Sequence, residues 1–311
     1  MTTSADLPLR PGIPRPVRAP GDGERPEAPA APRADCIADS AGGLTFDVEA
    51  PGRAESWDAA LLLRRRGGRA GGAAGELRLP LVPAGRGRLR AVLPSTVVLP
   101  EGRWDAYEAA PGAEPVRLTP GINDLRTIVD RHPDPGRGSV TVRLPYATKH
   151  GNLSVRSWLR SPHAEAGDLH VRDGELLLEG RLYGAVPGPG AAVEARCRRD
   201  PSEVRTVPVT ADGTRFSCTL PYPELAGPWQ GGDEPWDLWL RPAAGAGAVR
   251  ISRILDDVAD KKAVFGYPAR PLSTPRGPAL VGPYYTVDND LSVRLTEPEP
   301  EPEPGPEPGK S

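Results

Sequence analysis

The sequence predicts an all-β protein, and three observations support this prediction. Apolar and polar residues alternate with a period of two in many short runs, which is the pattern of half-buried strands. Glycine (36) and proline (40) are frequent and separate these runs, as tight turns require. A strand–turn–strand pattern, P-Y-x-T-x4-L-S-V-R, occurs at 145–156 and again at 283–294. Because no amphipathic helical pattern lies between the runs, we expect two tandem immunoglobulin-like antiparallel β-sandwiches.

The repeated pattern is expected to be a β-hairpin. Before the first turn, Val140, Val142 and Leu144 alternate with Thr141 and Arg143. After the turn, apolar and polar residues alternate again through 153–160. The turns contain His-Gly-Asn and Asp-Asn-Asp, residue types that tolerate positive φ or bond their own backbone. The hairpin therefore organises the fold, but it is not a catalytic signature.

Six further blocks recur in the same order, which indicates a tandem duplication with loop insertions. The matched segments are 43–48 and 175–180, 63–66 and 195–198, 79–81 and 207–209, 88–94 and 215–221, 104–105 and 236–237, and 125–130 and 251–256. The expected organisation is a disordered Pro/Ala-rich tail at 1–40, a sandwich at 41–166, its duplicate at 167–296 and an acidic Glu-Pro tail at 297–311.

Within the first unit the alternation predicts eight strands. They cover 43–49, 57–66, 75–82, 87–93, 102–109, 124–130, 138–148 and 152–160. In the second unit, apolar residues at helical spacing in 251–263 leave a short helical turn open. The glycine-rich segment 67–75 lacks the Lys-Ser/Thr of a phosphate-binding loop, so we interpret it as a hairpin loop.

Composition and termini limit the class of protein. The formal net charge is −2, whereas nucleic-acid binders usually carry a basic excess. The heavy use of Ala, Arg, Gly and Pro resembles actinobacterial coding bias. The N-terminus lacks a basic and an apolar signal region, and no apolar run approaches the ~20 residues of a membrane span. We therefore expect a cytoplasmic protein with no membrane span and no nucleic-acid partner.

The three cysteines, Cys36, Cys197 and Cys218, contain no C-x-x-C pair. We expect free, mostly buried thiols in a reducing compartment. Whether Cys197 and Cys218 lie close together stays open, because a disulfide depends on spacing that sequence does not give.

No motif predicts catalysis, a cofactor or a metal. The histidines His132, His150, His163 and His170 have no metal-ligand spacing, and we expect all four at the surface. The carboxylates at 256–260 and 288–290 lack calcium-loop spacing, which leaves only a weak, open Ca²⁺ contact. An acid–base enzyme assembled from distant strands also stays open.

The tryptophans are the first candidate binding residues. Trp104 and Trp236 occupy the same place in both units, which favours core packing over a sugar-stacking platform. Trp158, Trp229 and Trp239 have no matched tryptophan. We expect these three on the outward face or in a loop, as candidates for contact with a ligand.

The charged residues of the repeats are the second candidates. Asp105 and Asp237 follow the repeated tryptophans, and Arg156 and Arg294 close the Leu-Ser-Val-Arg blocks. If their strands are neighbours, Asp105–Arg156 and Asp237–Arg294 form equivalent cross-strand ion pairs that fix the register. Alternatively, the two arginines bind an anionic polymer.

The hairpin motif, together with L-P-E-G-R-W-D-A-Y at 99–107, resembles β-rich accessory modules of actinobacterial proteins. Those modules are associated with wall-polymer glycosyltransferases and glycerophosphotransferases. The resemblance covers roughly 41–296 and implies a setting in cell-envelope polysaccharide or teichoic-acid metabolism. It carries over no catalytic residue, because the chain lacks the catalytic domain of those enzymes.

The function expected is therefore a non-catalytic binding or accessory protein for a glycan or a partner enzyme. One alternative is a transferase for sugar or polyol-phosphate substrates, with a site between the two units. The other is a structural protein that self-associates through its sandwich edges. The ligand, the oligomeric state and the role of the acidic tail stay open.

Overall fold

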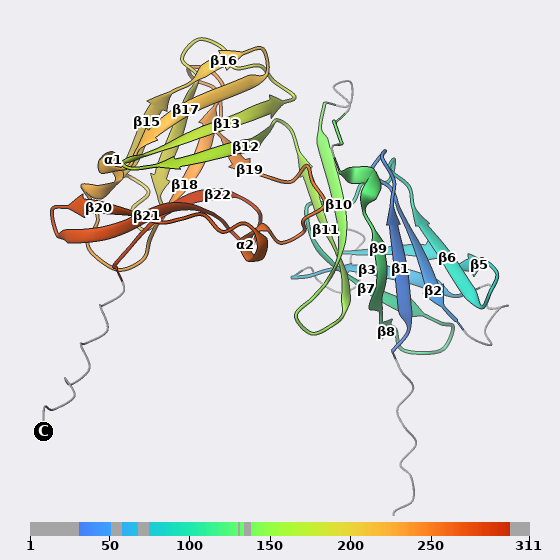
Figure 1. Cartoon of the computed structure of the whole chain (residues 1–311). Coiled ribbons are helices and arrows are strands. Elements are labelled where there is room, and N and C mark those ends of the chain that lie inside the picture. The colour runs from blue at the N-terminus through green and yellow to red at the C-terminus, as the bar shows by residue number, and fades with distance from the viewer. Residues whose placement is uncertain (1–30, 51–57, 68–74, 130, 134–137, 299–311) are drawn as a thin grey trace, which may run out of the picture. The chain divides into compact units, whose positions relative to one another are not determined.

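The computed structural model describes residues 31–50, 58–67, 75–129, 131–133 and 138–298 (Figure 1). In these residues the chain is nearly all β, with several largely antiparallel sheets, and the predicted fold class is confirmed. The immunoglobulin-like assignment and the tandem duplication stay predictions.

The first half of the chain, residues 31–160, forms two sheets. Figure 1 shows β1, β2 and β6 side by side in the first of them. In spatial order, this sheet consists of β5 (Val82–Pro83), β6 (Arg88–Leu93), β2 (Leu44–Glu49), β1 (Arg33–Ala38) and β9 (Thr119–Asp124). The second sheet consists of β10 (Val140–Ala147), β11 (Leu153–Arg160), β7 (Gly102–Ala109), β3 (Ala60–Arg65) and β4 (Glu76–Pro80), with β8 (Val116–Arg117) paired to β7.

The second half, residues 161–298, forms one continuous sheet. Its main path runs through β16 (Thr210–Asp212), β17 (Arg215–Pro221), β13 (Glu175–Tyr183), β12 (His163–Arg172), β19 (Val249–Ser252), β18 (Glu234–Arg241), β22 (Leu291–Thr296), β21 (Gly277–Tyr285) and β20 (Arg270–Thr274). A branch adds β14 (Ala192–Cys197), which pairs with β18 and with β15 (Val204–Pro208). The helical segments are η1 (Arg126–Ile128), α1 (Pro223–Ala226) and α2 (Lys261–Val264).

Two strand pairs depart from the antiparallel prediction. β1 pairs with β9 in parallel, and β12 pairs with β19 in parallel. Parallel neighbours need a long crossover connection, so their pairing is decided by packing rather than by a local turn. The two pairs stand at the same place in the strand order of the two halves, next to β2–β1 and β13–β12.

Buried apolar side chains form two main clusters. One contains residues of both first-half sheets, including Phe46, Leu89 and Leu63, which means that these sheets pack face to face. The other contains residues 164 to 295, including Leu178 and Leu238. The period-two burial of β2 and β18 follows directly from their alternating sequences.

The two repeated hairpins have the same turn. The amide of Thr148 donates to the carbonyl of Asn152 at 2.8 Å, and Thr286 donates to Asp290 at 2.8 Å. Positive φ falls on Gly151 (74°) and on Asn289 (62°). Glycine and asparagine tolerate this left-handed conformation, so the strand–turn–strand prediction at both places is correct.

Some predicted boundaries were wrong. Residues 33–38 were assigned to the tail but form β1, because Ala34, Cys36 and Ala38 enter the core. The predicted boundary at 166/167 falls inside β12. The strand expected at 124–130 is the end of β9 followed by η1. Residues 1–30, most of the loop at 67–75 and residues 299–311 lie outside the described residues.

The segment 251–263 is divided between two kinds of structure. Its start completes β19, and a single helical turn, α2, begins at Lys261. The short helical turn left open by the sequence is therefore present, ten residues later than the first apolar residue of the pattern.

Candidate functional site

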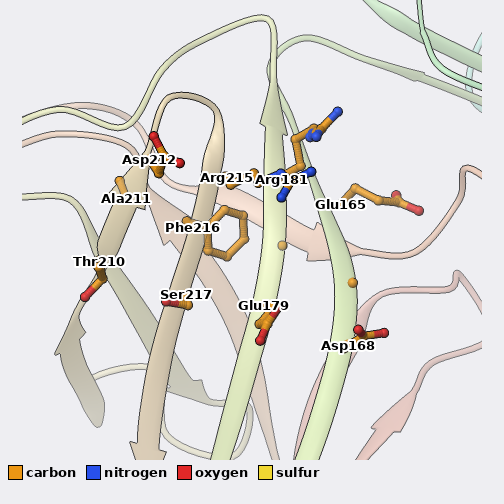
Figure 2. Close-up of a pocket in the computed structure, with 12 residues that line it drawn as sticks. Glu165, Asp168, Glu179, Arg181, Thr210, Ala211, Asp212, Arg215, Phe216 and Ser217 are labelled. Atoms are coloured by element: carbon orange, nitrogen blue, oxygen red, sulfur yellow. The ribbon is translucent and has the colours of Figure 1, made fainter.

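An open groove of about 450 Å³ lies over β12, β13, β16 and β17 in the second half. Figure 2 shows carboxylate, guanidinium and hydroxyl side chains from these four strands around it. The polar residues that line it are Glu165, Asp168, Glu179, Arg181, Thr210, Asp212, Arg215 and Ser217. Sequence reasoning named none of them.

Two local features shape the floor of the groove. The pairing of β12 with β13 is irregular between Ala166 and Leu169, so Gly167 and Asp168 leave the regular ladder. A Cβ at Gly180 would lie 2.4 Å from Phe216 Cζ and 2.7 Å from the Glu165 carbonyl oxygen. Glycine at 180 therefore lets the Phe216 ring pack against the strand, below the polar side chains.

The matching strands of the first half carry ion pairs on this face. Arg90 lies opposite Asp47 in the β2–β6 ladder and binds its carboxylate through two bonds, at 2.7 and 2.8 Å. Arg88 binds Asp35 at 2.5 Å. The guanidinium groups of Arg88 and Arg90 thus lie over β1 and β2 on this face.

In the second half the covering side chain is missing at one position. Ser217 lies opposite Glu179 in the β13–β17 ladder. The predicted duplication aligns 88–94 with 215–221, which sets Ser217 at the position of Arg90. A short hydroxyl side chain reaches less far than a guanidinium, and the surface above Glu179 is open.

One charged side chain of the groove lining, Glu165, is already bound by other groups of the protein. The Glu165 carboxylate accepts bonds from the amides of Ile254 and Leu255, each at 2.9 Å, and lies 2.7 Å from His163 Nε2. These contacts fix the Glu165 side chain. Glu179 lies 3.8 Å from His170 Nε2 and is exposed. Glu179, Asp212 and Arg215 are exposed and Ser217 is half-buried, and their acceptors and donors can bind a ligand rich in hydroxyl groups.

Two of the candidate tryptophans are buried, contrary to expectation. Trp158 is 0% exposed and Trp229 is 3% exposed. The indole N–H of Trp158 donates to the Asp288 carbonyl, and that of Trp229 donates to the Gly232 carbonyl. The period-two argument failed for Trp158 because both faces of β11 are covered from Leu153 to Trp158.

The other tryptophans are placed differently. Trp104 and Trp236 are buried in the two clusters. Trp239 is half-buried, and the guanidinium groups of Arg196 and Arg250 lie over its ring, 4.8 Å and 5.5 Å from the ring centre. Its face is therefore occupied by cations rather than open to a sugar ring.

The predicted ion pairs between the repeats' aspartates and arginines are wrong. The strands are neighbours as expected, but the register places Ser154 opposite Asp105 and Ser292 opposite Asp237. Each serine hydroxyl donates to its aspartate at 2.8 Å. Arg156 lies two residues further along and is opposite Arg103 instead.

Arg156 and Arg294 themselves have different surroundings. Arg156 is buried, bonds the Asp288 carboxylate at 2.7 Å and lies over the Trp158 ring. Arg294 is half-buried, with its guanidinium 4.6 Å from the Tyr284 ring centre. Neither lines the groove over β12 to β17.

The structure also shows the surroundings of the cysteines and of His163. Cys36, Cys197 and Cys218 are free and buried, and burial raises the pKa of the Cys218 thiol to about 12. His163 is fully buried against Glu165, so the expectation of a surface histidine was wrong there, because it overlooked a partner two residues away.

Within the described ranges, no group of His, Cys, Asp or Glu has the arrangement of a metal site. No helix in the described part of the chain is long and apolar enough to cross a membrane.

Comparison with known proteins gives distant structural likenesses. No family model and no curated protein matches the sequence. Among solved structures, S. aureus TarS is similar over 60% of this chain, with a TM-score of 0.30 and 15% identity. A structure of S. aureus TarS residues 217–571 is similar over 61% of this chain, with a TM-score of 0.28 and 13% identity. The chain covers 35% of the first TarS structure and 55% of the second.

Proposed function

We propose that this protein is a non-catalytic binding module that takes a hydroxyl-rich polymer, a glycan of the cell envelope, into the groove over β12, β13, β16 and β17. The observation that carries the proposal is the open surface above Glu179. The same face of the first half is covered by the Arg90–Asp47 and Arg88–Asp35 ion pairs.

The side chains of the groove fit such a ligand. Adjacent carboxylate and guanidinium groups can accept from and donate to neighbouring hydroxyls of one sugar ring. Ser217 and Thr210 add hydroxyl groups on β17 and β16. An open groove rather than an enclosed pocket suits a polymer that continues beyond the contact residues.

A binding role also agrees with the state of Glu165. Its carboxylate already accepts hydrogen bonds from two backbone amides and contacts His163, so its role is structural. The resemblance of the hairpin motif to accessory modules of wall-polymer transferases supports the cell-envelope setting of the proposal.

The test is to place an arginine over Glu179, as Arg90 lies over Asp47 in the first half. We expect Ser217→Arg to place a guanidinium over Glu179 and to weaken glycan binding about tenfold or more, because the ligand then competes with an internal ion pair. Binding is measured by calorimetric titration with purified cell-envelope polysaccharides.

The matched control is Thr219→Arg, which adds the same charge two residues along the same strand but outside the groove lining. It is expected to leave the affinity within about twofold. Equal losses in both variants, or binding of no polysaccharide by the native protein, would overturn the proposed function.

A further inference from the structure

A second cavity, of about 840 Å³, lies beside β7 and the turn of the β10–β11 hairpin. It shares no lining residue with the groove of Figure 2. Five cationic side chains line it, together with His150: Arg66, Arg103, Arg117, Lys149 and Arg156.

Two of the three carboxylates around this cavity, Asp105 and Asp288, are each shared by two arginines. Asp105 lies 2.6 Å from Arg66 and 3.3 Å from Arg117. A single carboxylate compensates one guanidinium charge, so this trio keeps an excess of positive charge.

Asp288 is shared in the same way. It lies 3.0 Å from Arg103 and 2.7 Å from Arg156. Lys149 is exposed at the hairpin turn and has no ion-pair partner among the residues that the structure describes, and the lining carboxylate Asp260 has none there either. Five lining cations therefore stand against three carboxylates: Asp105 and Asp260 in the lining, and Asp288 beside it. The cavity is electropositive although the whole chain carries a net charge of −2.

Two of the lining guanidinium groups also have spare donors. Arg117 Nη1 and Arg156 Nε are buried and have no hydrogen-bond partner within the described part of the chain. A buried donor without an acceptor costs about 1–3 kcal/mol, more when the group is charged. Acceptor oxygens of a bound anion relieve this cost, either directly or through an ordered water.

We propose that this cavity binds a phosphate ester or phosphodiester. Guanidinium groups present two parallel N–H donors that match the oxygens of a phosphate, and several of them surround the same space here. The volume is within the range of about 300–1,000 Å³ that holds small-molecule ligands. The cavity therefore has room for more than a free phosphate ion: an organic phosphate ester or one repeat unit of a phosphodiester polymer.

Binding is tested by calorimetric titration with glycerol phosphate and with a glycerol-phosphodiester polymer, at low and at high salt. We expect both to bind, with an affinity that falls as salt rises, because exposed charges are screened. Tighter binding of the polymer per phosphate identifies a polymer chain as the ligand, and equal affinity identifies a small phosphate ester.

The variants Lys149→Gln and Arg103→Gln remove cations from the cavity lining. Each is expected to weaken phosphate binding about tenfold, the loss of one charge-assisted hydrogen bond. Arg172→Gln, an exposed arginine on β12 that does not line the cavity, is expected to change the affinity by less than about twofold. Melting temperatures of all variants show whether each one is folded.

Absence of phosphate binding by the native protein would overturn this proposal, as would equal losses in all three variants. The Ser217→Arg variant is expected to bind phosphate normally, so the two proposals fail independently.

Discussion

At the scale of single residues, Asp105 on β7 and Asp237 on β18 have matching partners. Arg66 binds Asp105 at 2.6 Å, and Arg198 binds Asp237 at 2.5 Å. A second arginine and a serine hydroxyl complete each set, from Arg117 and Ser154 or from Arg250 and Ser292. Burial opposes ionisation of both carboxyls, but these bonds outweigh it, so the pKa of each lies below its ordinary value.

These lowered pKa values predict a specific pH dependence of stability. Because the folded-state pKa lies below the unfolded value of about 3.9, the stabilisation is fully present above the unfolded pKa and is lost as pH falls through the folded one. Asp105→Asn and Asp237→Asn remove it. We expect each to lower the free energy of unfolding by about 1–3 kcal/mol at neutral pH, and the difference from native protein to shrink toward about pH 2.

Urea unfolding followed by circular dichroism between neutral and acid pH measures this effect. Asp168→Asn is the control, because the Asp168 side chain is exposed at the groove. A difference that stays constant with pH would show that the two aspartates do not contribute through ionisation.

At the scale of elements, strand β1 (Arg33–Ala38) lies in a segment whose composition predicted a disordered tail. The strand pairs with β2 on one side and β9 on the other. Ala34, Cys36 and Ala38 are at most 2% exposed. A six-residue strand with small buried side chains carries a weak sequence signal, and the prolines before it extended the predicted tail too far.

Two truncations test this boundary. Deletion of 1–30 is expected to leave the melting temperature within about 2 °C, because its proline-rich and charged composition offers little apolar area to bury. Deletion of 1–38 removes β1, which leaves β9 without its strand partner and β2 paired with β6 on one side only. We therefore expect the melting temperature to fall by more than about 10 °C. Differential scanning fluorimetry measures both, and similar melting temperatures for the two truncations would contradict the role of β1.

At the scale of the whole molecule, the buried side chains form two large clusters. Residues of the two halves are in contact: Arg160 of β11 lies 3.1 Å from the Asp290 carboxylate and 2.6 Å from Ser252 Oγ, and Ile254 of the second half is buried in the first cluster. These partly exposed polar contacts and a small shared apolar contact contribute less to cooperativity than one apolar core common to both halves would.

We therefore expect two calorimetric unfolding transitions, one for each cluster. Leu63 and Leu238 are both 0% exposed, one in each cluster. Leu63→Ala and Leu238→Ala are each expected to cost about 2–5 kcal/mol and to move only one transition. A single transition that both variants shift equally would show that the clusters unfold as one unit.

The sequence by itself determined the local structure of this protein. Alternating side chains at β2, β6 and β18 specify strands, and the turn residues at 148–152 and 286–290 specify the two hairpins, because these signals act between near neighbours in the chain. The buried, unpaired cysteines also followed from composition. Sequence reasoning named Arg156 and Asp105, which line the cationic cavity, but predicted the wrong partner for each.

Tertiary structure alone decided the features that join distant segments. The register of β7 on β11 placed Ser154 rather than Arg156 opposite Asp105. A contact from Asp288 lies on the face of β11 on which Trp158 was expected to be exposed. The parallel pairing of β1 with β9 and the groove over β12 to β17 also depend on packing between segments far apart in the chain. One signal could be read from the sequence, because the predicted duplication aligns Ser217 with Arg90. Its physical consequence is an uncovered carboxylate at Glu179. This follows only from the β13–β17 ladder, which places Ser217 opposite Glu179.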